Sequence, residues 1–297
     1  MEIKVAKHAG FCFGVKKAIE IAEEVAKHNQ EKTYVYGQLV HNEKVIKDLE
    51  GKGLVFVDNI DEIPQNAVTV LRAHGEPGTT YQILEDKSIT KGKNLNDATC
   101  PLVTLVHNVA IKLKDNGYEV ILFGKANHPE AIGTSYHLKG KDTFIVEEPE
   151  QSDLVVDYIK KNSFEKIAII SQTTMSVHGY RELIDNLNSK LSDGKFEEIP
   201  LSMKNLDKKY GFVDTICNPT KQRQGDTEEL AGECDIVVVI GGKNSSNSKE
   251  LHAKCMELGV ESYFIQSKDQ LQKKWFDGKD DCCYNTKDGD TFSWEEK

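Results

Sequence analysis

The sequence lacks the features that mark membrane, secreted and nucleic-acid-binding proteins. No apolar run approaches the roughly 20 residues that a membrane-spanning helix needs. The N-terminus has neither the apolar core of a signal peptide nor a Ser/Arg-rich transit sequence, so we expect a cytoplasmic protein. The formal net charge is −10, and a negative surface repels nucleic-acid phosphates. We therefore predict no membrane and no nucleic-acid partner.

The cysteines include no C-x-x-C pair, so the usual spacings of zinc fingers, thioredoxins and ferredoxins are absent. In a reducing cytoplasm such cysteines are more often metal ligands, catalytic groups or buried side chains than disulfides. Any metal site must therefore combine cysteines from distant parts of the chain. The cysteines lie at positions 12, 100, 217, 234, 255, 282 and 283.

Apolar runs typical of β-strands alternate with amphipathic stretches typical of helices along the 297 residues. This alternation predicts α/β units with mostly parallel sheets, and the length suggests two or three domains. The predicted strands are 33–36, 54–57, 67–71, 120–123, 143–146, 166–170, 235–240 and 262–265. The predicted helices are 15–28, 43–49, 102–116, 177–191, 220–231 and 249–258. The polar stretch 192–214 is predicted to be a linker or a long loop.

One pattern occurs three times: a glycine directly after a predicted strand, a polar residue four positions later and another two positions further on. The copies are Gly37, His41 and Glu43; Gly124, His128 and Glu130; and Gly241, Ser245 and Asn247. A cysteine at the start of a predicted helix precedes each glycine by 24 or 25 residues, namely Cys12, Cys100 and Cys217. The simplest interpretation is three related α/β units, each contributing one thiol and one polar pair.

Three such units around a common centre would bring these thiols together. Ligands of open α/β sheets bind at the carboxyl ends of the strands, and helix N-termini favour anions, thiolates included. Three thiolates suit a cubane iron–sulfur cluster with one open iron, whereas a structural zinc site normally needs a fourth protein ligand. Cys234 and Cys255 fit an ordinary role as small buried side chains. Cys282 and Cys283 lie outside the repeat and receive no ligand role.

Three further loops carry polar side chains. The loop 72–77, which contains His74, follows a predicted strand and is bounded by Gly75 and Pro77, as site loops often are. The loop 171–174 supplies hydroxyl groups or an ordinary helix cap. The loop 244–248 combines a preceding glycine pair, short donors and a helix start, which are the ingredients of an anion site. It is the predicted phosphate-binding loop, although a plain cap is the alternative.

These residues resemble the 4-hydroxy-3-methylbut-2-enyl diphosphate reductase family of the LytB type, over about residue 3 to about residue 275. The matching segments are AGFCFGVKKAI at 9–19, VHNEKV at 40–45, RAHGEP at 72–77, DATCPLV at 97–103, HPE at 128–130, SQTT at 171–174, ICNPTKQRQ at 216–224 and GGKNSSNS at 241–248. The number and order of these motifs make a chance match improbable.

The resemblance implies three α/β domains, related by pseudo-threefold symmetry, around a central [4Fe–4S] cluster. We expect them at 14–99, at 100–195, and at 196–297 together with 1–13. By resemblance, the cluster ligands are Cys12, Cys100 and Cys217. The residues implied to bind the diphosphate are His41, His74, His128, Ser245, Ser246 and Asn247. Glu130 is implied as the proton source, with Thr173 and His128 as the other catalytic residues.

The implied activity is the reductive removal of the hydroxyl group of 4-hydroxy-3-methylbut-2-enyl diphosphate. The products are isopentenyl and dimethylallyl diphosphate of the non-mevalonate isoprenoid pathway. Hydroxide is a poor leaving group, so a Lewis-acidic iron and a nearby carboxylic acid lower the barrier to its departure. Ferredoxin or flavodoxin is the implied electron donor.

The C-terminus departs from the family pattern. Family members carry a further strand, an A-G-A-S-[TA]-P segment whose serine contacts the diphosphate, and a final helix, none of which is found in residues 275–297. We assign the vacant role to no other serine, Ser293 included, and expect the polar tail to be disordered. Loss of one charge-assisted hydrogen bond weakens binding by about 1.5–3 kcal/mol. The first alternative is therefore an impaired or non-catalytic iron–sulfur paralogue or sensor. The second is a zinc-dependent hydrolase that uses the histidines, although they lack the short His-x₃₋₄-His spacing.

Overall fold

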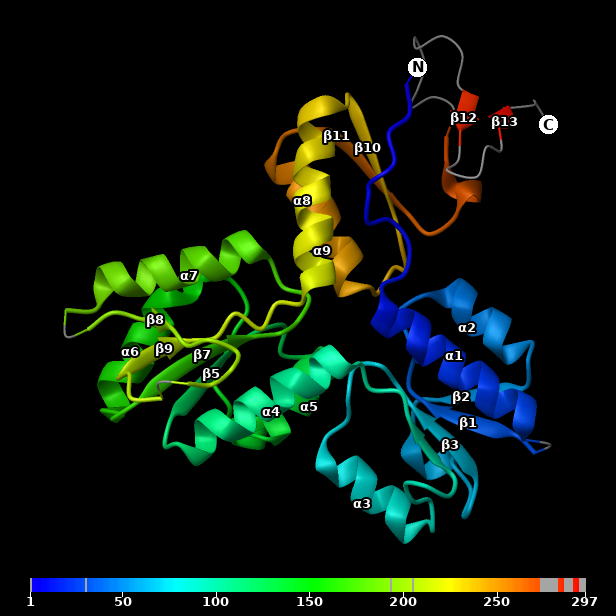
Figure 1. Cartoon of the computed structure of the whole chain (residues 1–297), viewed down its shortest axis with the longest axis horizontal. Helices are drawn as coiled ribbons and strands as arrows, with labels where there is room; N and C mark the ends of the chain where they lie inside the picture. The colour runs from blue at the N-terminus through cyan, green and yellow to red at the C-terminus, as the bar shows by residue number, and fades with distance from the viewer. Residues whose placement is uncertain are drawn as a thin grey trace. The chain divides into compact units, whose positions relative to one another are not determined.

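The computed structural model describes residues 2–29, 31–192, 194–204 and 206–272, together with the backbone of 283–285 and 291–293 (Figure 1). The chain divides into two compact units: residues 11–221 form the larger, and residues 1–10 with 222–297 form the smaller. None of the described helices is long and apolar enough to cross a bilayer. The predicted α/β class with mostly parallel sheets is confirmed. The predicted limits of the three domains stay a prediction.

The first sheet of the larger unit has four parallel strands. They are β1 (Thr33–Tyr36), β2 (Leu54–Val57), β3 (Val68–Leu71) and β4 (Leu95–Asp97), in the order β2-β1-β3-β4. The accompanying helices are α1 (Phe13–His28), α2 (Glu43–Glu50) and α3 (Gly78–Asp86), with a 3₁₀ turn at Ile60–Glu62. Val35 and Val70 pack with α1 on one face, and Leu71 packs with Leu84 of α3 on the other. Both faces are therefore covered, as is usual for parallel sheets.

The second sheet of the larger unit has five strands, also all parallel. They are β5 (Glu119–Phe123), β6 (Ile145–Val146), β7 (Ile167–Ser171), β8 (Glu197–Glu198) and β9 (Tyr210–Phe212), in the order β6-β5-β7-β9-β8. The accompanying helices are α4 (Pro101–Asp115), α5 (Pro129–Tyr136), α6 (Ser152–Asn162) and α7 (Val177–Lys190), with 3₁₀ turns at Gly140–Asp142 and Pro149–Gln151. Every residue of β5 and β7 is buried, so these strands form the centre of the sheet.

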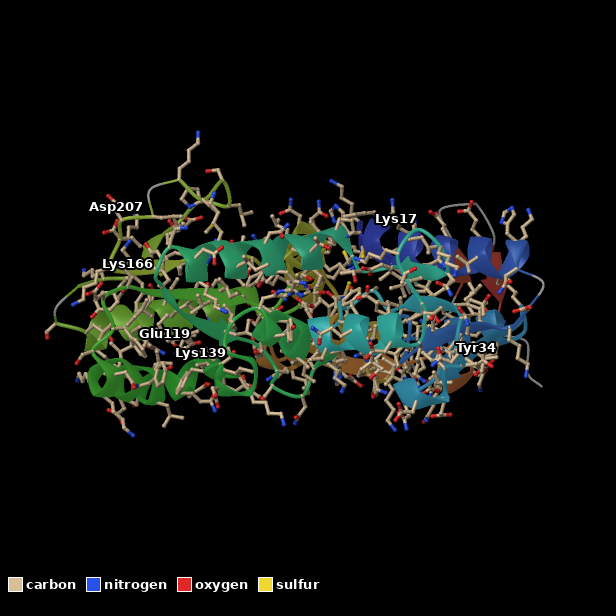
Figure 2. All side chains as sticks on the ribbon, turned by 90° about the horizontal axis from the view of Figure 1, so that it is seen from below. Lys17, Tyr34, Glu119, Lys139, Lys166 and Asp207 are labelled. Carbon is tan, nitrogen blue, oxygen red and sulfur yellow. The ribbon has the colours of Figure 1, made fainter. Side chains whose placement is uncertain are left out.

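The period of two along β5 explains why that strand is apolar throughout. Ile121 and Phe123 pack with α6 and α7 on one face, whereas Val120 and Leu122 pack with α4 on the other. The one charged residue of β5, Glu119, lies at its start and pairs with Lys139 at 2.6 Å (both are labelled in Figure 2). A buried carboxylate is therefore compensated by a cation at the edge of the core.

The prediction of a linker over residues 192–214 is wrong, because β8 and β9 lie there and extend the second sheet. Tyr210 is buried, and β9 pairs with the central strand β7. The side chain of Ile199 lies where a Cβ on Gly211 would be, so the glycine allows close packing. Both residues of β8 are exposed glutamates at the sheet edge. Short, polar edge strands carry little of the apolar signal on which strand prediction depends.

The smaller unit contains two parallel strands, β10 (Ile236–Ile240) and β11 (Glu261–Ile265). Helix α8 (Asn218–Glu233) begins in the larger unit and continues into the smaller, and α9 (Ser246–Glu257) follows β10; a 3₁₀ turn covers Lys268–Gln270. Val237, Val239 and Cys255 form the buried core, so Cys255 is a small buried side chain as expected. Cys234 packs against this core and is only partly buried.

The C-terminal prediction falls mostly outside the described residues. This holds for 273–282, 286–290 and 294–297, and for the side chains of Cys282, Cys283 and Ser293. Within the described backbone, β12 (Cys283–Asn285) and β13 (Thr291–Ser293) pair in antiparallel fashion. The described backbone of the tail therefore contains a strand pair that the sequence did not predict.

The threefold repeat predicted from the spacing has a common hydrogen-bond signature. Each of its glycines follows a strand and donates its amide to the last residue of the neighbouring parallel strand. The bonds are Gly37 N to Val57 O (2.8 Å), Gly124 N to Val146 O (2.8 Å) and Gly241 N to Ile265 O (2.9 Å). A helix follows each glycine, and its N-cap residues are Asn42, His128 and Ser245 respectively. The repeat is therefore a strand–glycine–helix segment that places polar residues at the carboxyl end of a sheet.

Candidate active site

The three cysteines of the repeat lie at helix starts, as predicted. Cys12 is the N-cap residue of α1, Cys100 is the N-cap residue of α4, and Cys217 directly precedes α8. All three are free thiols of intermediate burial. A Cβ on Gly14 would lie 2.5 Å from Cys100 Sγ and 4.0 Å from Cys12 Sγ. The glycine therefore leaves the space in which two thiols from distant parts of the chain approach each other.

The electrostatics of the thiols link them to one another and to Glu130. Burial is the main cause that raises the pKa of Cys100 and of Cys217, and backbone amides of the helix starts act in the opposite direction. The charges of Cys12 and Glu130 raise both pKa values further. Cys100 and Cys217, whose ionisation is disfavoured by the charge of Cys12, fit a cationic iron centre, since bound iron would offset this repulsion. The number and chemistry of the three thiols suit a [4Fe–4S] cluster with three protein ligands.

Three histidines converge from loops at the ends of different strands. His41 follows β1, His74 follows β3, and His128 follows β5. The ring centroids of His41 and His74 are 4.2 Å apart, and each lies 5.5 Å from that of His128. One nitrogen of each ring lies within 4.8 Å of the others. The structure thus brings together three of the residues predicted to bind diphosphate.

Backbone hydrogen bonds join the loops that carry these side chains. Ala73 N donates to Leu39 O at 3.1 Å, which ties the loop of His74 to that of His41. Cys100 N donates to Ala73 O at 2.9 Å, and Cys217 N donates to Thr173 O at 3.1 Å. Each of these two cysteines is therefore fixed to a loop that carries another predicted site residue.

His74, on the second of the three loops in chain order, is held in its uncharged form by its surroundings. Burial holds the pKa of His74 well below its usual value, and His41, His128 and Arg72 lower it further. His74 Nδ1 is buried without a hydrogen-bond partner among the described residues. His128 Nδ1 accepts from Glu130 N at 3.2 Å, so the ring proton lies on Nε2. A buried anion would supply the missing acceptor to His74 and favour its charged form.

Glu130 is a buried carboxyl group held by Thr173. It is 2% exposed, at the second position of α5. Its Oε1 accepts from Thr173 N at 2.6 Å, and its Oε2 accepts from Thr173 Oγ1 at 2.8 Å. Burial raises the pKa of Glu130 to about 7, although both bonds from Thr173 lower it. Such a group can hold and release a proton near neutral pH.

The comparisons with known proteins agree with this geometry. Residues 3–284 match the family model described as LytB protein. The chain belongs to the LytB family. Among its relatives, proteins named 4-hydroxy-3-methylbut-2-enyl diphosphate reductase occur in a Nitratiruptor species and in Aquifex aeolicus. The first is 36% identical over 284 residues, which is 95% of this chain and 91% of that protein. The second is 36% identical over 281 residues, which is 94% of this chain and 88% of that protein.

Two solved structures share the fold of this LytB-family chain. One is the E-1-hydroxy-2-methyl-but-2-enyl-4-diphosphate reductase from Plasmodium falciparum, with a TM-score of 0.75 and 28% identity, covering 91% of this chain and 77% of that one. The other is an (E)-4-hydroxy-3-methyl-but-2-enyl diphosphate reductase, described as the terminal enzyme of the non-mevalonate pathway. Its TM-score is 0.61 at 34% identity, covering 93% of this chain and 89% of that one.

The predicted phosphate-binding loop lies in the smaller unit, whereas the histidines belong to the larger. Ser245 caps α9 by accepting from Ser248 N at 3.3 Å, so the capping role left open by the sequence is present. Ser246 and Asn247 occupy the first turn of α9. Asn247 Oδ1 is buried without a hydrogen-bond partner among the described residues. The binding of diphosphate by these three residues stays a prediction.

Sequence reasoning missed residues that support the predicted side chains. Gln38 Oε1 lies 3.0 Å from His41 Nδ1 and orients that ring. Arg72 Nε pairs with Glu76 Oε1 at 2.5 Å inside the loop of His74. Gln38 directly follows a glycine of the repeat, and Arg72 and Glu76 are four positions apart in the loop of His74. Their closeness in sequence to predicted site residues is the one signal that could have indicated their supporting role.

Proposed function

We propose that this chain is a 4-hydroxy-3-methylbut-2-enyl diphosphate reductase. It would convert its substrate, with two electrons and two protons, into isopentenyl or dimethylallyl diphosphate and water. The observation that carries the proposal is Glu130, a buried carboxyl group of raised pKa that Thr173 binds twice. It lies beside a histidine cluster suited to an anion, and its charge influences two of the three converging thiols.

The cofactor proposed is a [4Fe–4S] cluster held by Cys12, Cys100 and Cys217. When bound, it would supply electrons one at a time and a Lewis-acidic iron close to the hydroxyl group that leaves. The thiols reach this place from three helix N-termini, whose amides favour ligands with negative charge. Gly14 keeps the space between two of them free of a side chain.

The substrate diphosphate is proposed to bind His41, His74 and His128, together with Ser245, Ser246 and Asn247. A neutral His128 already directs an Nε2–H donor away from its bond to Glu130 N. Diphosphate beside His74 would raise the low pKa of that ring, so binding should take up protons. Affinity for diphosphate should therefore increase as the pH falls.

Glu130 is proposed to deliver the proton that the departing hydroxyl group requires. With a pKa of about 7, it carries a proton in a substantial share of molecules at neutral pH. Thr173 Oγ1 fixes the carboxyl group, and its hydroxyl can pass a proton along the same hydrogen bond. His128 helps to hold Glu130 in place through the backbone amide at the start of α5.

The electrons are proposed to come from ferredoxin or flavodoxin in the cytoplasm, since both carry single electrons. The non-catalytic alternative has no support in the described residues, where Glu130, Thr173 and the histidine cluster are all in place. The zinc alternative has one supporting observation. One nitrogen of each of the three histidines lies within 4.8 Å of the others, a spacing that a single metal ion could bridge.

The test is to purify and reconstitute the full chain without oxygen, and to analyse its metal content and its products. We expect iron and sulfide with a brown colour, and conversion of the substrate by a reduced viologen dye into both diphosphates, identified by mass spectrometry. Zinc without iron would favour the hydrolase. An iron–sulfur protein that leaves the substrate intact would contradict the proposed function.

A further inference from the structure

The third of the three helix starts contains a hydrogen bond to a cysteine sulfur. Thr220 Oγ1 lies 3.1 Å from Cys217 Sγ. Thr220 is 1% exposed, so water does not compete with this contact. Its backbone amide also donates to Cys217 O at 3.0 Å, which fixes the residue above the cysteine. The hydroxyl group is therefore held against the sulfur by the first turn of α8.

The other two helix starts differ at the corresponding position. The residue three positions after the cysteine is Val15 in the first copy, Val103 in the second and Thr220 in the third. Valine and threonine have nearly the same shape, so the copies differ chiefly by a methyl group in place of a hydroxyl group. The chain thus offers an internal comparison in which one of three equivalent thiols has a hydroxyl donor three residues later.

The direction of this bond follows from the chemistry of a ligating cysteine. A thiolate bound to iron has no proton to donate, so Thr220 must be the donor and Cys217 Sγ the acceptor. A donor draws electron density from the sulfur and stabilises the more negative, reduced form of a cluster. The effect is strong when the bond is buried, because the local dielectric constant is low.

We propose that Thr220 is a positioning residue that raises the reduction potential of the cluster through its hydrogen bond to Cys217 Sγ. This inference rests on the cluster of the proposed function. Cys217 would then be a weaker electron donor to iron than a thiolate without a hydroxyl neighbour. A donor protein of given potential would reduce a larger fraction of the enzyme than it would with valine at this position.

The experiment is a potentiometric titration of the reconstituted full chain, followed by electron paramagnetic resonance. Thr220→Val gives the third helix start the residue found in the other two. We expect its midpoint potential to be more negative, with an approximately tenfold lower ratio of reduced to oxidised cluster at a fixed potential, or about 59 mV for one electron. Thr220→Ser should keep the wild-type potential because it keeps the hydroxyl group.

Thr227→Val is the matched control, since Thr227 is a second buried threonine of α8 and should leave the potential unchanged. An unchanged potential in Thr220→Val with full iron content would overturn the inference. If Thr220→Val does not retain iron, Val103→Thr decides: a more positive potential supports the inference, and an unchanged or more negative one overturns it. A wild-type chain that binds no iron–sulfur cluster would instead refute the proposed function.

Discussion

The second and third copies of the strand–glycine–helix segment share a backbone and differ in what they present. The second offers His128 and Glu130, the third Ser245 and Asn247, at the same two positions after the glycine. The surroundings differ too: β5 is buried throughout, whereas Ile240 at the end of β10 is 65% exposed. In the described residues β10 has β11 as its one strand partner, while β5 lies between β6 and β7.

The repeated backbone fixes where the polar side chains lie, whereas the neighbouring segments determine how deeply each side chain is buried and what it bonds to. Glu43 occupies the same position as Glu130 but is exposed at the start of α2. Glu130 is buried and bonded to Thr173. A carboxyl group at the repeated position is thus buried and fixed in the second copy, where Thr173 in the loop after β7 binds it, and is exposed in the first copy.

The largest expected effect is a loss of bound iron. It should follow substitution of the cysteines at the helix starts but not of those in the core of the smaller unit. Serine at position 12, 100 or 217 should abolish the brown colour and most of the bound iron, because three thiolates are needed to hold the cluster. Cys234→Ser should retain both. Iron and sulfide analysis after anaerobic reconstitution measures this. Full iron content in any of the first three variants would remove that cysteine from the ligand set.

A second prediction compares the contribution to stability of one isoleucine in the five-stranded sheet with that of one isoleucine in the β10–β11 sheet. Ile169→Ala empties a fully buried site in β7 and should lower the free energy of unfolding by about 2–5 kcal/mol. Ile240→Ala removes an exposed side chain and should change it by less than about 0.5 kcal/mol. Urea unfolding followed by circular dichroism measures both. Equal losses would mean that Ile240 is packed in solution.

The third prediction concerns the histidine cluster. His74→Asn should weaken substrate binding roughly 10- to 150-fold, as expected for one lost hydrogen bond to a charged group. His178→Asn is the control, since His178 lies on the exposed face of α7 with 69% of its side chain accessible. Calorimetric titration with the substrate on the oxidised enzyme gives both affinities. Unchanged binding in His74→Asn would contradict the proposed diphosphate site.

The smallest expected effect is a shift of a pH profile. The Thr173 hydroxyl lowers the pKa of Glu130, so Thr173→Val should raise that pKa and keep the carboxyl group protonated to higher pH. The decline of kcat/KM with rising pH should then move upward, with a lower maximum because the carboxyl group is less firmly oriented. Thr174→Val is the neighbouring control. If kcat/KM of Thr173→Val declines at the same pH as in the wild type, the Thr173 hydroxyl does not influence the ionisation of Glu130.

Most of the fold could be predicted because its strands carry a strong apolar signal. All eight predicted strands are present within two residues of their expected ends. Helices α3, α5 and α6 and strands β4, β8, β9, β12 and β13 were missed. Helix α5 contains Gly133, whose Cβ would lie 3.3 Å from the carbonyl oxygen of Gly75. Tertiary packing therefore selected a residue that local propensity disfavours in a helix.

The candidate site could be predicted as far as the repeat extends. Its spacing indicated Cys12, His41 and Glu130 before any contact was known. The role of Gly14 and the bond of Gln38 to His41 could not be read from spacing, since both depend on segments that meet only in the folded chain. The raised pKa of Glu130 likewise comes from burial, which spacing alone does not reveal.

The most direct test of the central claim compares Glu130→Gln with Glu43→Gln, which alter the same repeated position in two copies. The oxidation of reduced viologen is followed after adding 4-hydroxy-3-methylbut-2-enyl diphosphate to each reconstituted enzyme. We predict a loss of about 10²- to 10⁴-fold in turnover for Glu130→Gln, with the cluster intact, and wild-type turnover for Glu43→Gln. Substrate-dependent oxidation at the wild-type rate in Glu130→Gln would contradict the account.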